Sequence, residues 1–290
     1  RAIAESGQAA ILWQPETAHA LTLKYLSILG ISPNNVSALK SLPIDSLVKA
    51  EDKLLDYMIK NTPTKVFSPT IDGQLITHDL FTCLSPKQSN NVSLMIGTNK
   101  DESSMFASRR LKMAPSNSKQ LEKQFFYLLK PEEQVRLTKS YPKYPHKRGV
   151  FNFLTDAVFR IPAIRLAECQ LVNSPVYMYR FQWSSFALNL AGLRSFHGLE
   201  LPFVFGNSDD KLGKILKLIA TKKLIHRLTN EMQEAWVNFA RYGNPNGNTG
   251  GKWKPYDTKE RTTMIFGKQS KIVDDPDATP RKAWEGVSYY

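Results

Sequence analysis

Short apolar runs that alternate with helix-forming segments constrain the fold of this 290-residue sequence more than any other feature. The run Val92–Gly97 is too short for an ordinary helix and is closed by a glycine, as is typical of a strand buried on both faces. The run Val176–Trp183 is rich in aromatic and β-branched residues and predicts a second strand. Between them, Pro162 favours the start of a helix over 162–173, because proline is tolerated at the first helical position.

The rest of the chain continues the alternation. Apolar residues spaced three to four apart predict a long amphipathic helix from Leu224 that ends at Gly243. The segments 262–267 and 270–275 are typical of short strands. Near the N-terminus, apolar spacing predicts a helix ending at Gly30 and another over 46–61. The order of elements predicts an α/β architecture with a mainly parallel sheet and flanking helices.

Composition narrows the class of protein. The 39 Lys and Arg residues outnumber the 26 Asp and Glu residues, but they form no dense run, so nucleic-acid binding is not favoured. Cys83 and Cys169 lack metal-ligand spacing, so neither a disulfide framework nor a zinc site is indicated. No apolar stretch reaches the length of a membrane span, and the first residues lack a secretory pattern. We therefore expect a cytoplasmic protein without a metal site or a membrane span.

Two polar residues that follow predicted strands could carry chemistry. Glu102 comes shortly after Gly97, and His197 follows the strand predicted to end at Trp183. In parallel sheets, functional residues gather on the loops after the carboxyl ends of the strands. An acid followed by a histidine is the order of the last two members of a serine-hydrolase triad, in which the carboxylate orients the imidazole. The spacing alone leaves open that His197 is a packing residue beside Phe196.

Six separated strings of the sequence carry a resemblance to a known family. They are GTNKDESSMF (97–106), TDAVFRIPAIRLAE (155–168), VYMYRFQW (176–183), FHGLELPFVFG (196–206), MQEAWVNFARYGNPN (232–246) and WKPYDTKERTTMIFG (253–267). Together, over Arg1 to Trp284, they resemble the type B carboxylesterase family, which includes cholinesterases and bacterial para-nitrobenzyl esterases. The resemblance implies an α/β-hydrolase fold and hydrolysis of a small uncharged or anionic ester through an acyl-enzyme, without a cofactor. The lack of secretory cysteines brings the sequence closer to the cytosolic bacterial branch.

The resemblance also implies roles for the candidate residues. Glu102, in NKDES, corresponds to the triad acid, although Ser103 stands where the family commonly has glycine. His197, in FHGLELPFVFG, corresponds to the triad base. Glu200 of the same motif is at least as well explained as a buried carboxylate that ties its loop to neighbouring backbone.

Two residues and one short segment are weaker candidates for the surroundings of the active site. Trp183 and Phe186 follow a predicted strand and are candidates for substrate contact. Pro69–Gly73 resembles a P-x-x-D-G element of the family and predicts a turn near the rim of the active site.

The nucleophile is the part of the triad that these residues lack. The opening string RAIAESGQA resembles the segment after the nucleophile elbow, and no G-x-S-x-G occurs in the sequence. We therefore expect residues 1–290 to be the C-terminal portion of one α/β-hydrolase domain, inactive alone, with the serine and the oxyanion loop in a partner segment upstream of Arg1. Ser6 precedes a glycine but lacks the first glycine of an elbow, which favours a structural serine near a turn. A non-catalytic binding or scaffold protein and an inactive truncated remnant stay open as alternatives.

Overall fold

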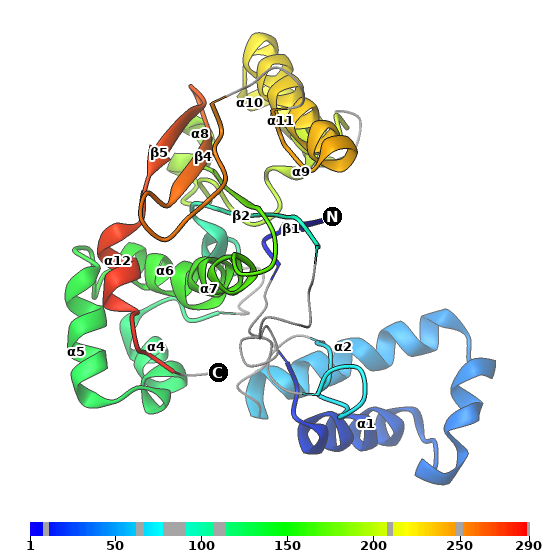
Figure 1. Cartoon of the computed structure of the whole chain (residues 1–290). Helices are drawn as coiled ribbons and strands as arrows, with labels where there is room; N and C mark the ends of the chain where they lie inside the picture. The colour runs from blue at the N-terminus through cyan, green and yellow to red at the C-terminus, as the bar shows by residue number, and fades with distance from the viewer. Residues whose placement is uncertain are drawn as a thin grey trace. The chain divides into compact units, whose positions relative to one another are not determined.

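The computed structural model describes residues 1–7, 12–61, 67–77, 91–106, 114–207, 211–246 and 252–288. The chain falls into two compact units (Figure 1). The larger comprises Arg1–Ala9 and Leu84–Tyr289, and the smaller comprises Ala10–Cys83 with Tyr290. The expectation of one domain over residues 1–290 stays a prediction, and Cys83 lies outside the described residues.

A five-stranded sheet, with its strands in chain order, organises the larger unit. Its strands are β1 (Ala2–Glu5), β2 (Leu94–Asn99), β3 (Val176–Phe181), β4 (Thr262–Phe266) and β5 (Lys271–Asp274). The pairs β1–β2, β2–β3 and β3–β4 are parallel, and β5 runs antiparallel to β4. The predicted mainly parallel sheet is therefore confirmed, and the carboxyl ends of the first four strands lie at the same end of it.

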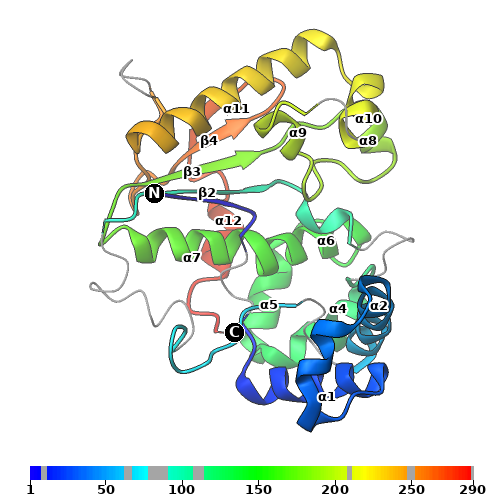
Figure 2. The same cartoon turned by 90° about the vertical axis from the view of Figure 1, so that its right-hand side faces the viewer.

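Helices cover both faces of this sheet. The described helices of the larger unit are α4 (Ser118–Phe125), α5 (Pro131–Ser140), α6 (Lys147–Thr155), α7 (Ile161–Gln170), α8 (Phe186–Leu190), α9 (Leu201–Val204), α10 (Lys211–Ile219), α11 (Lys222–Tyr242) and α12 (Ala278–Ala283). Figure 2 shows α7 on one side of the strands and α11 on the other.

Side chains of the central strands alternate between two cores. Leu94 and Ile96 of β2 join the core shared with α6 and α7, whereas Met95 joins the core shared with α9, α10 and α11. In β3, Met178 and Tyr179 divide in the same way. Because both faces of a strand are buried, its sequence reads as a continuous apolar run.

The helix around Pro162 begins earlier than the sequence suggested. A π-helical turn, η4 (Asp156–Arg160), joins α6 to α7, and the residues at both junctions keep right-handed helical angles. The expectation of a helix that starts at Pro162 is confirmed to within one residue, since α7 begins at Ile161, but the sequence did not predict that helical backbone continues into it from α6 and η4. A proline ring crowds the carbonyl four residues earlier, and the wider π turn just before α7 accommodates it.

The smaller unit contains α1 (Pro15–Leu29), the 3-10 segment η1 (Pro33–Ser41) and α2 (Ile44–Asn61). Gly30 ends α1 with a left-handed φ of 69°, as its sequence predicts. The core of this unit consists of Trp13, Leu21, Leu54 and Met58.

The turn expected over Pro69–Gly73 is formed only from Asp72 onward, because Thr70 pairs with Trp13 in a parallel β-bridge. Asp72 Oδ1 accepts hydrogen bonds from the backbone N–H groups of residues 74, 75 and 76. The expected place of this turn near the active-site rim stays a prediction. Within the described parts of the chain, no helix is both long enough and apolar enough to cross a membrane.

Gly97 lies where β2 and β3 approach closely, and it offers a test of the sheet register. It pairs with Tyr179, and a Cβ at position 97 would lie 2.4 Å from the Tyr179 ring and carbonyl oxygen. We expect Gly97→Ala to lower the free energy of unfolding by about 1–3 kcal/mol, because the buried ring has no room to move.

Gly267→Ala is the matched control, because its Cβ would meet the Gln182 side chain at 3.3 Å. It should cost less than about 1 kcal/mol in urea unfolding. Equal losses in the two variants would contradict the packing of β2 against β3.

Candidate active site

Glu102 and His197 meet at the carboxyl end of the sheet. Glu102 begins the 3-10 turn η2 (Glu102–Ser104) after β2, and His197 lies in the loop between α8 and α9. Nδ1 of His197 is 2.7 Å from Oε2 of Glu102, although the residues are 95 positions apart. The expected contact between them is confirmed, whereas their catalytic roles stay a prediction.

The strands that lead to this site end at other residues than the sequence suggested. β2 continues two residues past Gly97 to Asn99, because Thr98 and Asn99 still pair with β3. β3 ends at Phe181, two residues before Trp183. Polar residues at the end of β2 concealed its true length.

Three donors surround the Glu102 carboxylate, which is fully buried. Oε1 accepts from the backbone N–H of Asn99 at 2.6 Å and from the Ser6 hydroxyl at 2.5 Å. Oε2 accepts from His197. A buried carboxylate is tolerated only when hydrogen bonds replace its lost water, so these donors fix both of its oxygens.

Ser6 is a site residue whose contact the sequence did not reveal. It follows β1 directly, has a left-handed φ of 53°, and donates its backbone N–H to Gly97 at 2.9 Å. The expected turn is present, but the hydroxyl bonds to the acid. The nucleophile of a triad must give its proton to the imidazole. The Ser6 hydroxyl donates to Glu102 instead, so Ser6 is not placed as the nucleophile. Its position just after a strand beside β2 was the available signal.

The imidazole of His197 sits against two aromatic rings. The ring centroids of Phe106 and Phe159 each lie 5.2 Å from that of His197. The His197 side chain is 34% exposed, which leaves room for a reacting group to reach it. Because Nδ1 faces the carboxylate, Nε2 is the nitrogen directed away from it.

The charges around His197 set its affinity for a proton. Burial opposes the charged imidazolium, but the hydrogen bond and charge of Glu102, with the charge of Glu200, outweigh burial and raise the pKa of His197 above its usual value. This is the direction expected for a histidine that shares its proton with a carboxylate.

Asn99 links the two carboxyl groups of the site. Its backbone N–H bonds to Glu102, and its side-chain Nδ2 bonds to Oε2 of Glu200 and, at 2.7 Å, to the carbonyl of Phe196. Glu200 is only 2% exposed, and burial together with the charge of Glu102 raises its pKa to about 7. Glu200 therefore ties the His197 loop to the end of β2. It does so by accepting a hydrogen bond from the Asn99 side chain, whereas a bond to neighbouring backbone was expected from the sequence.

The two candidates for substrate contact lie in different surroundings. Trp183 is 5% exposed and packs edge-on against Phe203 in the core, with ring centroids 5.6 Å apart. Phe186 is 83% exposed on α8. Contact of either residue with substrate stays a prediction.

In the described parts of the chain, His, Cys, Asp and Glu side chains form no group of three or more that could hold a metal ion.

The raised pKa of Glu200 predicts how its substitution changes stability with pH. A carboxyl whose pKa rises from 4.5 to about 7 on folding loses stability as pH increases through that window. Glu200→Gln keeps an oxygen acceptor for Asn99 and removes the charge. The free energy of unfolding of Glu200→Gln, measured against that of the native chain, should therefore be higher at pH 8 than at pH 5, by up to about 3 kcal/mol.

Thermal unfolding at both pH values measures this change. Glu234→Gln, on the exposed side of α11, is the matched control and should change the melting temperature equally at both. A Glu200→Gln effect that is the same at pH 5 and pH 8 would contradict the burial of an ionisable group here.

Comparison with known proteins places this chain in a family. A family model described as "Carboxylesterase family" matches residues 1–284. The para-nitrobenzyl esterase of Bacillus subtilis (strain 168) is 29% identical over 282 residues, covering 97% of this chain and 56% of that protein. The cholinesterase of Mus musculus is 26% identical, covering 98% of this chain and 50% of that protein. The chain thus spans about half the length of the curated relatives it matches.

Solved structures agree with the sequence relatives. A thermophilic PNB esterase aligns with a TM-score of 0.79 and 28% identity, covering 98% of this chain and 56% of that one. The carboxylesterase of Geobacillus stearothermophilus at pH 6.2 aligns with a TM-score of 0.77 and 28% identity, covering 98% and 58%. The sheet and helices of the larger unit therefore have the α/β-hydrolase fold, and the chain belongs to the carboxylesterase family.

Proposed function

We propose that these residues supply the acid and the base of a Ser-Glu-His triad that hydrolyses carboxylic esters. Glu102 is the acid and His197 is the base. The observation that carries the proposal is the 2.7 Å contact between His197 Nδ1 and a buried, fully hydrogen-bonded carboxylate. A scaffold protein on the same fold has no need of such a pair, which supports an enzyme.

The reaction proposed is acyl transfer through a covalent intermediate. His197 takes the proton of a serine hydroxyl on Nε2 as the serine oxygen attacks the ester carbonyl, and it then gives that proton to the departing alcohol. Water attacks the acyl-enzyme by the same route, with His197 again as the base. Throughout, Glu102 keeps the proton on Nδ1 and stabilises the imidazolium.

The serine and the oxyanion loop are proposed to come from a segment upstream of Arg1. Three observations support this: the sequence has no G-x-S-x-G, the Ser6 hydroxyl is directed at the acid, and β1 is the edge strand of the described sheet. An edge strand exposes backbone groups that another strand can pair with. Such a segment would be the principal partner of these residues.

The substrate proposed is a small uncharged or anionic ester. A surplus of 13 positive charges favours anionic over cationic ligands, and relatives of this chain include a para-nitrobenzyl esterase and a cholinesterase. The sequence contains two cysteines, which supports a reducing, cytoplasmic location in a bacterial cell.

Hydrolysis of a short-chain nitrophenyl ester tests the proposal. We expect no turnover by residues 1–290 alone, and turnover when they are preceded by the segment encoded upstream. In that longer protein, His197→Ala should lower kcat by about a thousandfold or more, because the serine loses its base. His226→Ala, on the exposed side of α11, is the matched control and should retain activity.

Two results would contradict parts of this account. Turnover by residues 1–290 alone that is lost in His197→Ala would place the nucleophile within them. An inactive longer protein with an intact G-x-S-x-G would contradict ester hydrolysis.

A further inference from the structure

The turn that presents Glu102 is anchored at its first residues. The backbone N–H of Asp101 donates to the carbonyl of Ser195 at 3.0 Å, which joins this turn to the His197 loop. The carbonyl of Lys100, two residues before Glu102, accepts a hydrogen bond from Nη2 of Arg160 at 3.0 Å. A buried guanidinium therefore holds the point where the chain leaves β2.

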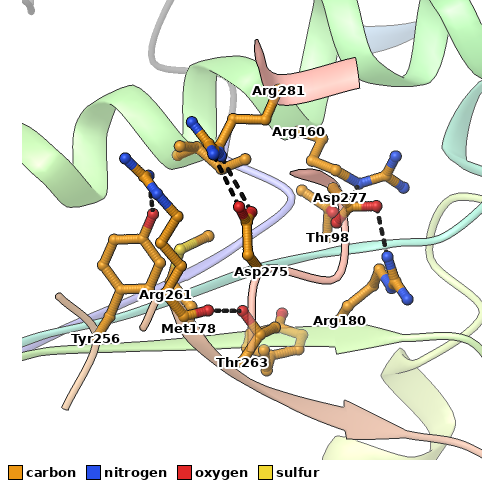
Figure 3. A pocket seen from close by; sticks show the side chains of 13 residues that line it. Thr98, Arg160, Met178, Arg180, Tyr256, Arg261, Thr263, Asp275, Asp277 and Arg281 are labelled. Carbon is orange, nitrogen blue, oxygen red and sulfur yellow. Dashed lines mark hydrogen bonds and ion pairs between the residues drawn. The ribbon is translucent and has the colours of Figure 1, made fainter. Parts of the chain in front are cut away.

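Two nitrogens of the Arg160 guanidinium, Nη1 and Nη2, donate hydrogen bonds to different parts of the fold, and the third, Nε, lies near a carboxylate without a hydrogen bond to it. Nη1 pairs with Asp156 one turn earlier, and Nε lies 3.4 Å from Oδ2 of Asp277. Asp277 is in turn held by Arg180 of β3, whose Nη1 is 2.5 Å from Oδ1. Figure 3 shows Asp277 between the two arginines. Arg160 thus joins the turn before Glu102 to η4 and to the residue that precedes α12.

The partners of Arg160 are themselves fixed. Asp156 is 1% exposed and accepts a 2.7 Å hydrogen bond from the Tyr141 hydroxyl, which accepts one of 2.7 Å from Trp284 Nε1. Burial opposes ionisation of Asp156 more than Arg160 favours it, and raises the pKa of Asp156 to about 6. Burial also opposes the charge of Arg160, but Asp277 and Asp156 outweigh it and raise the pKa of Arg160. The guanidinium therefore stays charged.

We propose that Arg160 is a positioning residue for Glu102, which fixes the carboxylate against His197 by holding the Lys100 carbonyl. The proposal rests on the proposed function, in which Glu102 orients the base. The planar guanidinium hydrogen-bonds to Asp156 and to the Lys100 carbonyl while Nε lies beside Asp277, whereas a lysine ammonium in the same place keeps the charge and loses this geometry. Loss of the Lys100 contact removes the anchor at the point where the chain leaves β2. The later residues of the turn keep their other contacts, among them Ser103 N–H to Thr155 Oγ1, so we expect the carboxylate to move more freely without losing the turn.

A second buried arginine nearby provides the matched control. Arg281 faces the same small cavity and pairs with Asp275 (Figure 3). It also pairs with Glu285. The cavity measures about 20 Å³, room for about one water molecule, so it is no substrate pocket. Arg281 has the same charge as Arg160 and a similarly small exposed fraction. Its two ion-pair partners, however, are residues that flank α12, so its ion pairs do not reach the turn that carries Glu102.

The experiment is a pH titration of the His197 ring by NMR in the 290-residue chain, with the signal assigned by its loss in His197→Gln. In Arg160→Lys, the pKa of His197 should fall toward that of an exposed histidine, because the contact with Glu102 loosens. Arg281→Lys should lower the melting temperature without moving the His197 titration. In the longer, ester-hydrolysing protein, Arg160→Lys should lower kcat on the order of tenfold and leave KM unchanged.

The outcomes separate this inference from the proposed function. An unchanged His197 titration in a folded Arg160→Lys variant, or equal shifts in Arg160→Lys and Arg281→Lys, would overturn the positioning role whether or not the protein hydrolyses esters. If Arg160→Lys does not fold, Arg180→Lys decides, because it keeps Arg160 but loosens Asp277, the carboxylate beside Arg160 Nε, so that the guanidinium holds the Lys100 carbonyl less firmly. It should lower the pKa of His197 by a smaller amount, and no change would overturn the inference.

Discussion

The hydrogen bonds that replace water around the Glu102 carboxylate are the constraint on which the rest of the site depends. A charge with no exposure to solvent is costly unless donors surround it, and here the donors come from three segments far apart in the sequence. Ser6 follows β1, Asn99 ends β2, and His197 follows β3. The parallel arrangement of these strands brings their carboxyl ends together, so the sheet itself assembles the surroundings of the carboxylate.

Charge is distributed in two layers behind the imidazole. The nearer layer holds Glu102 and Glu200, joined by Asn99, and it raises the pKa of His197 against the effect of burial. The farther layer is the network of Arg160, with Asp156 and Asp277, under the turn that carries Glu102. Each carboxylate of these two layers therefore has a partner of opposite sign or a hydrogen-bond donor.

Sequence patterns were sufficient for β2, β3, β4 and β5, the long helices and the acid and base candidates, but not for β1. Apolar runs and helical spacing locate β2, β3 and α11, and the residues after the strands include Glu102 and His197. The same patterns did not locate the π-helical turn before Pro162, because the proline rule allows a helix to start there without requiring it.

Contacts made by polar side chains across the fold were beyond the reach of sequence patterns. The hydroxyl of Ser6 and the guanidinium of Arg160 reach the acid and its turn only in three dimensions, over 96 and 60 positions. Neither residue lies at a recognisable spacing from its partner, since the distance along the chain is set by intervening helices. Residues that position a catalytic group are therefore harder to predict than the group itself.

The titration of His197 by NMR in the native chain and in Glu102→Gln tests the central claim most directly. If His197 and Glu102 form the acid–base pair described here, the pKa of His197 lies above the usual value for histidine and falls when the carboxylate is replaced, because the charge of Glu102 and its hydrogen bond raise that pKa. A His197 whose pKa is not raised and is unaffected by Glu102→Gln would contradict the account.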